Sequence, residues 1–155
     1  MSSEIRSFLS SENVIVSMEA SCKRSVLKQL AAHAQKTMGL DETSLLDSLL
    51  EREQLGSTGI GRGVAVPHAR AEISQMRGIF ARLAQPVDFD SIDDRPVDLV
   101  FLLLAPERAD ADHLKALSRV ARLLRSDEVQ DAMRGAADAE ALYAIAVGDA
   151  DAQAA

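Results

Sequence analysis

The sequence predicts a single α/β domain in which helices cover both faces of a β-sheet. Stretches with apolar residues at helical spacing alternate along the chain with short strand-like runs. The run at 97–104 is apolar on both faces, which is typical of a central strand covered on both sides. A chain of 155 residues suits one compact domain, and 47% hydrophobic residues supply its core. We therefore expect about five strands and five or six helices in three layers over 1–147, followed by a small polar tail at 148–155 that frays.

Caps and stops define the two helices expected in the first half of the chain. Ser21 is expected to cap a helix that ends before Gly39, because glycine readily takes the left-handed conformation found after helix ends. Asp41 or Thr43 is expected to cap the next helix, which ends near Gln54. The shorter elements expected are a helix at 5–9 and strands at 14–16, 64–66 and 78–83.

The second half of the chain is expected to be mostly helical. The segment 112–125 has the pattern of an amphipathic helix. Ser126 and Asp138 are each followed by an acidic residue within one turn, so each is expected to cap a further helix. The residues of 112–125 expected to face inward are Leu114, Leu117, Ala121 and Leu124.

The charge balance and the single cysteine restrict the environment and the partners. Seventeen basic and 24 acidic residues give a net charge of −7, which repels nucleic-acid backbones and favours partners with a basic surface. Cys22 is the only cysteine, so no disulfide can form within the chain, which fits a reducing cytoplasm. The apolar run 97–105 is interrupted by Asp98 and is too short to span a bilayer. We expect a cytoplasmic protein without nucleic-acid binding or membrane insertion.

A glycine-rich segment followed by a histidine is the first candidate for chemistry. Residues 56–63 hold four glycines in eight positions, and Pro67 stiffens the backbone that enters His68. The loop amides are expected to face the histidine, since concave runs of N–H groups bind anions. An imidazole with a pKa near 6.5 is largely neutral in the cytoplasm and nucleophilic. An ordinary turn with an incidental histidine is the alternative. The expected phosphate-binding residues of the loop are Gly56, Ser57, Thr58, Gly59 and Gly61.

Two other side chains are placed to support an anion on His68. His113 opens the helix at 112–125, where the helix dipole favours an anion and keeps the imidazole neutral. Arg52 lies near the end of the helix before the glycine loop, where a guanidinium can clamp phosphate oxygens. Taken alone, each side chain would be interpreted as an ordinary surface residue. His33 lies in mid-helix without a functional signal.

Other chemistries do not fit the sequence. The glycine loop lacks the Gly-Lys-Ser/Thr ending of a nucleotide-binding P-loop, and no strand–GxGxxG–helix pattern is present. The histidines and Cys22 do not have metal-ligand spacing. The aspartates at 88–94 do not match a calcium-binding loop and are expected to form a solvated turn. We therefore expect neither a cofactor nor a metal.

Three segments resemble the IIA domains of the fructose/mannitol class in the bacterial phosphotransferase system. REQLGSTGIGRGVAVPH at 52–68 resembles their active-site segment, and DSIDDRPVDLVFLLLAP at 90–106 and HLxxL from His113 match as well. The resemblance covers about 13–147. Within the class, GSTGIG at 56–61 looks most like the nitrogen-regulatory branch, IIA-Ntr.

The resemblance implies a fold and a set of roles. It implies an α/β/α sandwich around a mixed five-stranded sheet, a phosphohistidine at His68, and supporting roles for Arg52 and His113. The phosphoryl group would come from an HPr-like carrier, with Nε2 as the expected attacking atom, and regulatory target proteins would read the phosphorylation state. The chain would then be a phosphotransferase component rather than an enzyme that turns over small molecules. Two alternatives stay open: a sugar-transport IIA that passes phosphate to a IIB cysteine, and a binding-only regulatory module.

Overall fold

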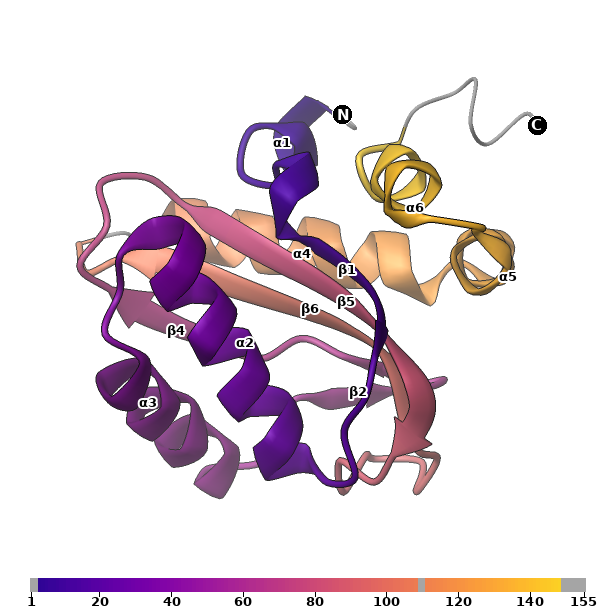
Figure 1. Cartoon of the computed structure of the whole chain (residues 1–155), viewed down its shortest axis with the longest axis horizontal. Coiled ribbons are helices and arrows are strands. Elements are labelled where there is room, and N and C mark those ends of the chain that lie inside the picture. The colour runs from indigo at the N-terminus through magenta and orange to yellow at the C-terminus, as the bar shows by residue number, and fades with distance from the viewer. Residues whose placement is uncertain (1–2, 109–110, 149–155) are drawn as a thin grey trace.

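A mixed six-stranded sheet forms the centre of the computed structural model, which describes residues 3–108 and 111–148 (Figure 1). Of the expected tail at 148–155, all but Gly148 lies outside the described residues. The strands are β1 (Val14–Met18), β2 (Gly59–Gly61), β3 (Val64–Ala65), β4 (His68–Ala71), β5 (Arg77–Val87) and β6 (Val97–Pro106). The helices are α1 (Ser3–Arg6), a 3₁₀ turn η1 (Ser11–Asn13), α2 (Lys23–Met38), α3 (Glu42–Gln54), α4 (Ala111–Arg125), α5 (Asp127–Gly135) and α6 (Ala139–Ala146).

The strand β6 holds the sheet together. It pairs antiparallel with β5 and parallel with both β3 and β4, while β1 joins β5 in parallel and β2 joins β3 antiparallel. Successive residues of β6 alternate between two apolar cores: Val100, Leu102 and Leu104 enter one, and Leu99, Phe101 and Leu103 enter the other. A strand buried on both faces is what the apolar run predicted.

The two cores define three layers. One core lies between the sheet and α2 and α3, and the other lies between the sheet and the layer of α1, α4, α5 and α6 (Figure 1). The predicted fold class, a three-layer sandwich around a mixed sheet, is therefore confirmed. The chain places α2 and α3 on one face of the sheet and, after the strands β2 to β6, α4, α5 and α6 on the other.

Most of the predicted caps are present. The left-handed Gly39 (φ +73°) ends α2, and the carboxylate of Asp41 accepts the N–H of Ser44 at 2.9 Å to start α3. Ser126 and Asp138 cap α5 and α6. The prediction for Ser21 is wrong: α2 begins one residue later, with Cys22 in the cap position and no side-chain capping bond. This helix is held by its buried face, so a side-chain cap is not required.

The predicted inward face of α4 is wrong at its first position. Leu114 is 69% exposed, and Leu117 and Ala121 are only partly buried. The helix is turned by about one residue, so that His113 enters the interior on the face that also carries the small Ala116. The buried residues of α4 are His113, Ala116, Val120 and Leu124. A pattern of apolar residues therefore located the helix but not its orientation.

The glycine segment forms a hairpin and a turn rather than one loop. Gly59–Gly61 is the strand β2, and it is joined to β3 by Arg62 and Gly63, whose φ angles are +59° and +81°. Two positive φ angles match the twist of a two-residue hairpin. After β3, Val66 and Pro67 interrupt the strand, so His68 begins β4 instead of closing β3 as expected. The carbonyl of Pro67 still accepts the N–H of Leu103 on β6 at 2.9 Å.

We predict that Gly63→Ala destabilises the fold by about 1–3 kcal/mol, because a side chain there is strained at positive φ. A Cβ at this position would also lie 2.6 Å from Nη2 of Arg134, which is fixed to Asp98 by two hydrogen bonds of 2.9 Å. Gly135→Ala is the control, because its Cβ would meet nothing within 4 Å. Urea unfolding measures both; equal stability of the two variants would contradict the prediction.

Candidate functional site

The side chain of His68 is held in one tautomer. Its Nδ1 lies 3.0 Å from the carbonyl oxygen of Val66, and its Nε2 lies 3.2 Å from Nε of Arg52. A carbonyl only accepts and a guanidinium only donates, so Nδ1 carries the proton and Nε2 carries the lone pair. The partly buried ring thus presents Nε2 as its nucleophilic atom.

Burial favours the neutral form of His68. Desolvation lowers the pKa of this histidine below its ordinary value, and the positive charge of Arg52 acts in the same direction. The Val66 carbonyl and the carboxylate of Glu53 oppose the shift without cancelling it. At neutral pH the imidazole is therefore uncharged and able to attack.

Arg52 reaches His68 from the last turn of α3. Its Nη1 donates to the carbonyl of Gly56 at 2.8 Å while Nε donates to His68. The two contacts use different nitrogens of one planar group, so the guanidinium is oriented as well as placed. The sequence-based expectation that Arg52 lies beside His68 agrees with this geometry.

His113 approaches from the opposite layer. It lies in the first turn of α4, is 9% exposed, and its ring centroid is 5.6 Å from that of His68 with the planes at 73°. Desolvation lowers the pKa of His113, and repulsion from a protonated His68 and from Arg70 lowers it further. Among the described residues its buried Nε2 has no hydrogen-bond partner. A buried polar atom without a partner is costly, and an anion on His68 offers one.

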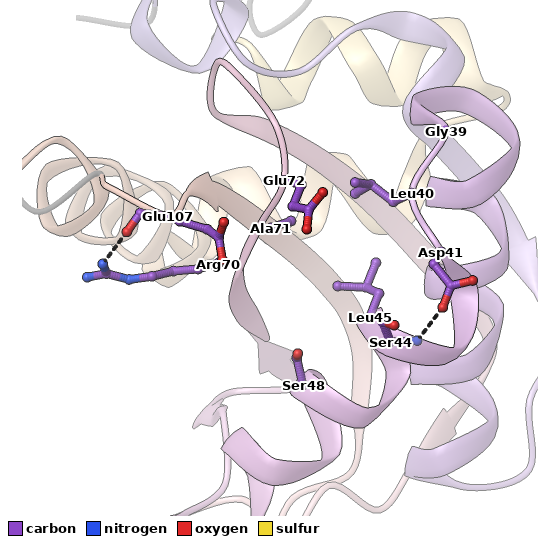
Figure 2. Close-up of a pocket in the computed structure, with 10 residues that line it drawn as sticks. All are labelled: Gly39, Leu40, Asp41, Ser44, Leu45, Ser48, Arg70, Ala71, Glu72 and Glu107. Atoms are coloured by element: carbon purple, nitrogen blue, oxygen red, sulfur yellow. Dashed lines mark hydrogen bonds between the residues drawn. The ribbon is translucent and has the colours of Figure 1, made fainter.

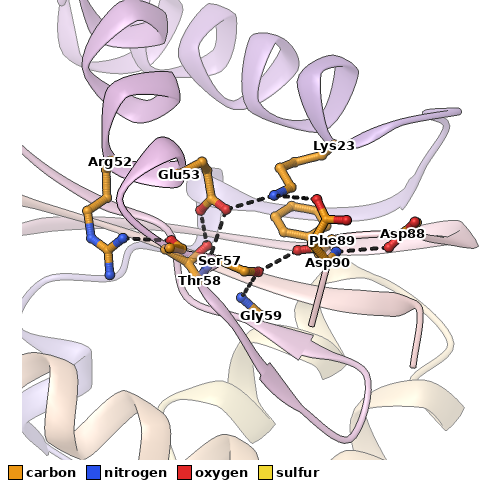
Figure 3. A network of polar contacts seen from close by, with 10 residues as sticks. Lys23, Arg52, Glu53, Ser57, Thr58, Gly59, Asp88, Phe89 and Asp90 are labelled. Carbon is orange, nitrogen blue, oxygen red and sulfur yellow. Dashed lines mark hydrogen bonds and ion pairs between the residues drawn. The ribbon is translucent and has the colours of Figure 1, made fainter. Parts of the chain in front are cut away.

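The predicted loop residues have a different part from the one expected. The N–H of Gly56 donates to the backbone carbonyl of Glu53 at 3.2 Å, and the N–H of Thr58 donates to the side chain of Glu53, also at 3.2 Å. The N–H of Gly59 donates to Oγ of Ser57 at 2.9 Å. Ser57 in turn donates to the carbonyl of Phe89 (Figure 3). The N–H groups of Gly56, Thr58 and Gly59 are therefore already engaged with α3 and with the loop, and the loop supports Arg52 through the carbonyl of Gly56.

Gly61 lies beside the loop that follows β5. It belongs to β2, and a Cβ there would lie 3.3 Å from a carboxylate oxygen of Asp93 and 3.7 Å from the side chain of Ile92. Its contacts are thus with the aspartate-rich turn at 88–94. Of the residues predicted from the sequence, Arg52 and His113 are the two that contact the ring of His68.

Sequence reasoning missed two residues close to this site. Glu53 is buried next to Arg52, and Lys23 from the first turn of α2 lies 3.0 Å from its Oε1 (Figure 3). Charged helix residues are usually exposed, so neither stood out in the sequence. The one feature of the sequence that could have indicated a role for Glu53 is its position between Arg52 and the glycine-rich segment.

A polar cleft of about 400 Å³ lies apart from the histidines (Figure 2). It is bounded by the junction of α2 and α3 and by the end of β4, and Arg70 at its edge donates to the carbonyl of Glu107 at 2.8 Å. None of Arg52, His68 and His113 lines it. Within the described residues, no group of three metal-ligating side chains occurs, and no helix has the length and apolar character to cross a membrane.

Comparison with known proteins identifies the family. Residues 7–146 match the profile described as phosphoenolpyruvate-dependent sugar phosphotransferase system, EIIA 2. The chain belongs to the EIIA 2 family. The resemblance found in the sequence is thereby confirmed, and the arginine and two histidines lie in a domain of this phosphotransferase class.

Relatives within the EIIA 2 family include several nitrogen regulatory proteins. One from Bradyrhizobium diazoefficiens is 45% identical over 142 residues, covering 91% of this chain and 93% of that protein. One from Escherichia coli is 36% identical over 144 residues, covering 92% and 88%. The crystal structure of IIA-Ntr from Neisseria meningitidis has a TM-score of 0.87 at 33% identity, covering 92% of this chain and 99% of that one. The predicted likeness to the nitrogen-regulatory branch is confirmed.

We predict that Arg52→Gln raises the pKa of His68, because a positive charge that disfavours the imidazolium is removed. In the unaltered protein the midpoint should lie below the ordinary value of about 6.5. Titration of the imidazole nitrogens by ¹⁵N NMR measures both proteins. An unchanged or lower midpoint in the variant would contradict the placement of the guanidinium.

Proposed function

We propose that this chain is a nitrogen-regulatory phosphocarrier that accepts a phosphoryl group on Nε2 of His68. The observation that carries the proposal is the unprotonated Nε2 of His68, which contacts the guanidinium of Arg52. The ring of His113 lies 5.6 Å from that of His68, and its buried Nε2 has no partner among the described residues. Family membership makes an HPr-like protein the phosphodonor.

The transfer begins with the lone pair of Nε2. A bond from Nε2 to phosphorus forms while the bond from phosphorus to the donor's histidine nitrogen breaks, and that electron pair stays on the donor nitrogen. Positive charge grows on the ring of His68 and is stabilised by the hydrogen bond from Nδ1 to the Val66 carbonyl. The protein contributes mainly positioning and charge stabilisation.

Arg52 changes partner during this step. Nε2 cannot accept the hydrogen bond of Arg52 and bond to phosphorus at once, so Nε of Arg52 passes to a phosphoryl oxygen. The contact between its Nη1 and the Gly56 carbonyl keeps the guanidinium within reach. His113 donates from its Nε2 to another phosphoryl oxygen, and thereby gains the partner that this buried atom lacks among the described residues.

Phosphorylation state then controls which partners bind. A phosphoryl group adds about −1.5 to −2 charges near neutral pH, on a chain whose net charge is already −7. Regulatory proteins that cover His68 with apolar groups should bind the unphosphorylated form, because covering the anion costs desolvation. We place this single domain, 1–147, in the cytoplasm without nucleic-acid partners, which suits its acidity and its one exposed cysteine.

A sugar-transport IIA that hands its phosphate to a IIB cysteine is the second candidate. It is favoured by 33% identity over 144 residues to the fructose-specific EIIABC component of Bacillus subtilis, of which this chain spans 23%. Assay of the phosphorylated protein with a purified IIB domain separates the two. Rapid transfer to the IIB cysteine would favour the transport function over the regulatory one.

We predict that His68→Ala abolishes phosphorylation by a phosphorylated HPr-like carrier, while His33→Ala retains it. The label on the unaltered protein should be acid-labile and base-stable, as expected for a phosphohistidine. Radiolabel transfer followed by gel analysis is the measurement, with circular dichroism to show that both variants fold. Labelling of His68→Ala would overturn the assignment of the acceptor.

We predict that Arg52→Ala slows the same transfer by about 10- to 150-fold, because this is the rate effect expected when a hydrogen bond to a charged group is lost. His113→Ala should also slow it. Arg62→Ala is the control. Arg62 lies on the β2–β3 hairpin, and its side chain pairs with Asp127 of α5 at 2.8 Å instead of contacting His68. Quench-flow rates measure the effect, and control-like rates in both site variants would show that neither residue acts on the phosphoryl group.

A further inference from the structure

Glu53 is a buried carboxylate that the proposed reaction does not use directly. Its side chain is only 6% exposed, although it lies in the last turn of α3 next to Arg52. Three donors surround it: Nζ of Lys23 at 3.0 Å, the N–H of Thr58 at 3.2 Å, and the hydroxyl of Thr58 (Figure 3). Two oxygens that face three donors suit a carboxylate, which only accepts hydrogen bonds.

We propose that Glu53 is a positioning residue that fixes Arg52 and His68 for phosphoryl transfer by locking the turn at 56–58. The inference rests on the proposed function for its effect on the reaction. Its structural part, the ordering of Arg52, stands independently of phosphorylation.

The first link runs from Glu53 to Arg52. The two neighbours hold the same turn, because Glu53 binds Thr58 (Figure 3) and Nη1 of Arg52 binds the carbonyl of Gly56. A fixed turn gives Arg52 a fixed acceptor. Without it, the long side chain regains its rotamer freedom, which opposes the contact between Nε and His68.

The second link runs from Glu53 to the backbone of His68. Thr58 donates its N–H to Glu53, and its carbonyl accepts the N–H of Val66 at 2.9 Å. The carbonyl of Val66 is the group that holds Nδ1 of His68. Thr58 thus connects one carboxylate to the supports of both the arginine and the histidine.

Lys23 anchors this network to a third part of the chain. Besides Glu53, its Nζ lies 3.3 Å from Oδ2 of Asp90 and 5.5 Å from the centre of the Phe89 ring. The carbonyl of Phe89 accepts the hydroxyl of Ser57. The start of α2, the end of α3, the turn and 88–90 therefore converge on Glu53, and the charge of Lys23 balances the carboxylate close to where an anion is to bind.

Three variants separate positioning from a general loss of structure. Glu53→Gln removes the charge, Thr58→Val removes one hydroxyl with little change in shape, and Glu51→Gln is the control on an exposed residue of the same helix. Hydrogen exchange of the Arg52 Nε–H, followed by NMR, reports the ordering of the guanidinium. We expect the Arg52 Nε–H to exchange at least about tenfold faster in Glu53→Gln and in Thr58→Val, because tenfold is the smallest effect expected when a hydrogen bond to a charged group is lost. The exchange rate in Glu51→Gln should not change.

Phosphoryl-transfer rates supply the functional part of the test. Glu53→Gln and Thr58→Val should each slow transfer by about tenfold in the presence of Arg52. In an Arg52→Ala background each should slow it clearly less than in the unaltered protein, because part of the effect of Glu53 passes through Arg52. Additive losses in that background would show a merely structural role and overturn the functional part.

The two readouts distinguish failure of this inference from failure of the proposed function. If the unaltered protein accepts no phosphoryl group, the proposed function fails, yet the exchange of the Arg52 Nε–H still decides whether Glu53 orders the guanidinium. Unchanged exchange in both Glu53→Gln and Thr58→Val overturns the inference whatever the transfer rates are. Should Glu53→Gln not fold, the exchange rate in Thr58→Val decides by itself, since that variant leaves the carboxylate with Lys23.

Discussion

The hydrogen bond from Nδ1 of His68 to the carbonyl of Val66 determines which nitrogen of the ring can react. It exists because the chain breaks its strand at Val66 and Pro67, between β3 and β4, which both pair with β6. A continuous strand would direct its carbonyls into the ladder with neighbouring strands. The interruption frees one carbonyl for the imidazole, while the buried β6 keeps both short strands in place.

The site combines this fixed tautomer with groups that are poised for an anion. Arg52 and the buried Nε2 of His113 come from helices in different layers, so the sheet edge between them sets their spacing around His68. Desolvation lowers the pKa of each histidine and keeps both rings neutral at physiological pH. One neutral ring can then attack while the other donates a hydrogen bond, and the positive charge in contact with His68 is a guanidinium that remains charged throughout.

The sequence predicted the fold where local chemistry decides the outcome. The run at 97–104, the glycine after α2 and the caps Ser126 and Asp138 each have one physical interpretation, and the structure agrees with it. Of the two caps considered for α3, Asp41 and Thr43, the structure has Asp41. Within the site, the proximity of Arg52, His68 and His113 was implied by family resemblance. Their approach to one another depends on tertiary packing that spacing alone does not specify.

Where the prediction failed, tertiary contacts overrode the local pattern. Leu114 has the apolar character of a core residue, but the rotation of α4 puts His113 inside and Leu114 in solvent. The glycine loop has the composition of an anion cradle, yet Glu53 and Ser57 engage several of its amides. Glu53 itself gave no signal, because only the folded chain brings Lys23 and Thr58 to it.

NMR of the phosphorylated protein carrying ¹⁵N-labelled histidine tests most directly whether Nε2 of His68 is the acceptor atom. We expect a one-bond coupling between phosphorus and Nε2 of His68, with the proton still on Nδ1 opposite the Val66 carbonyl. Coupling of phosphorus to Nδ1 of His68, or to a nitrogen of His113, would contradict this assignment.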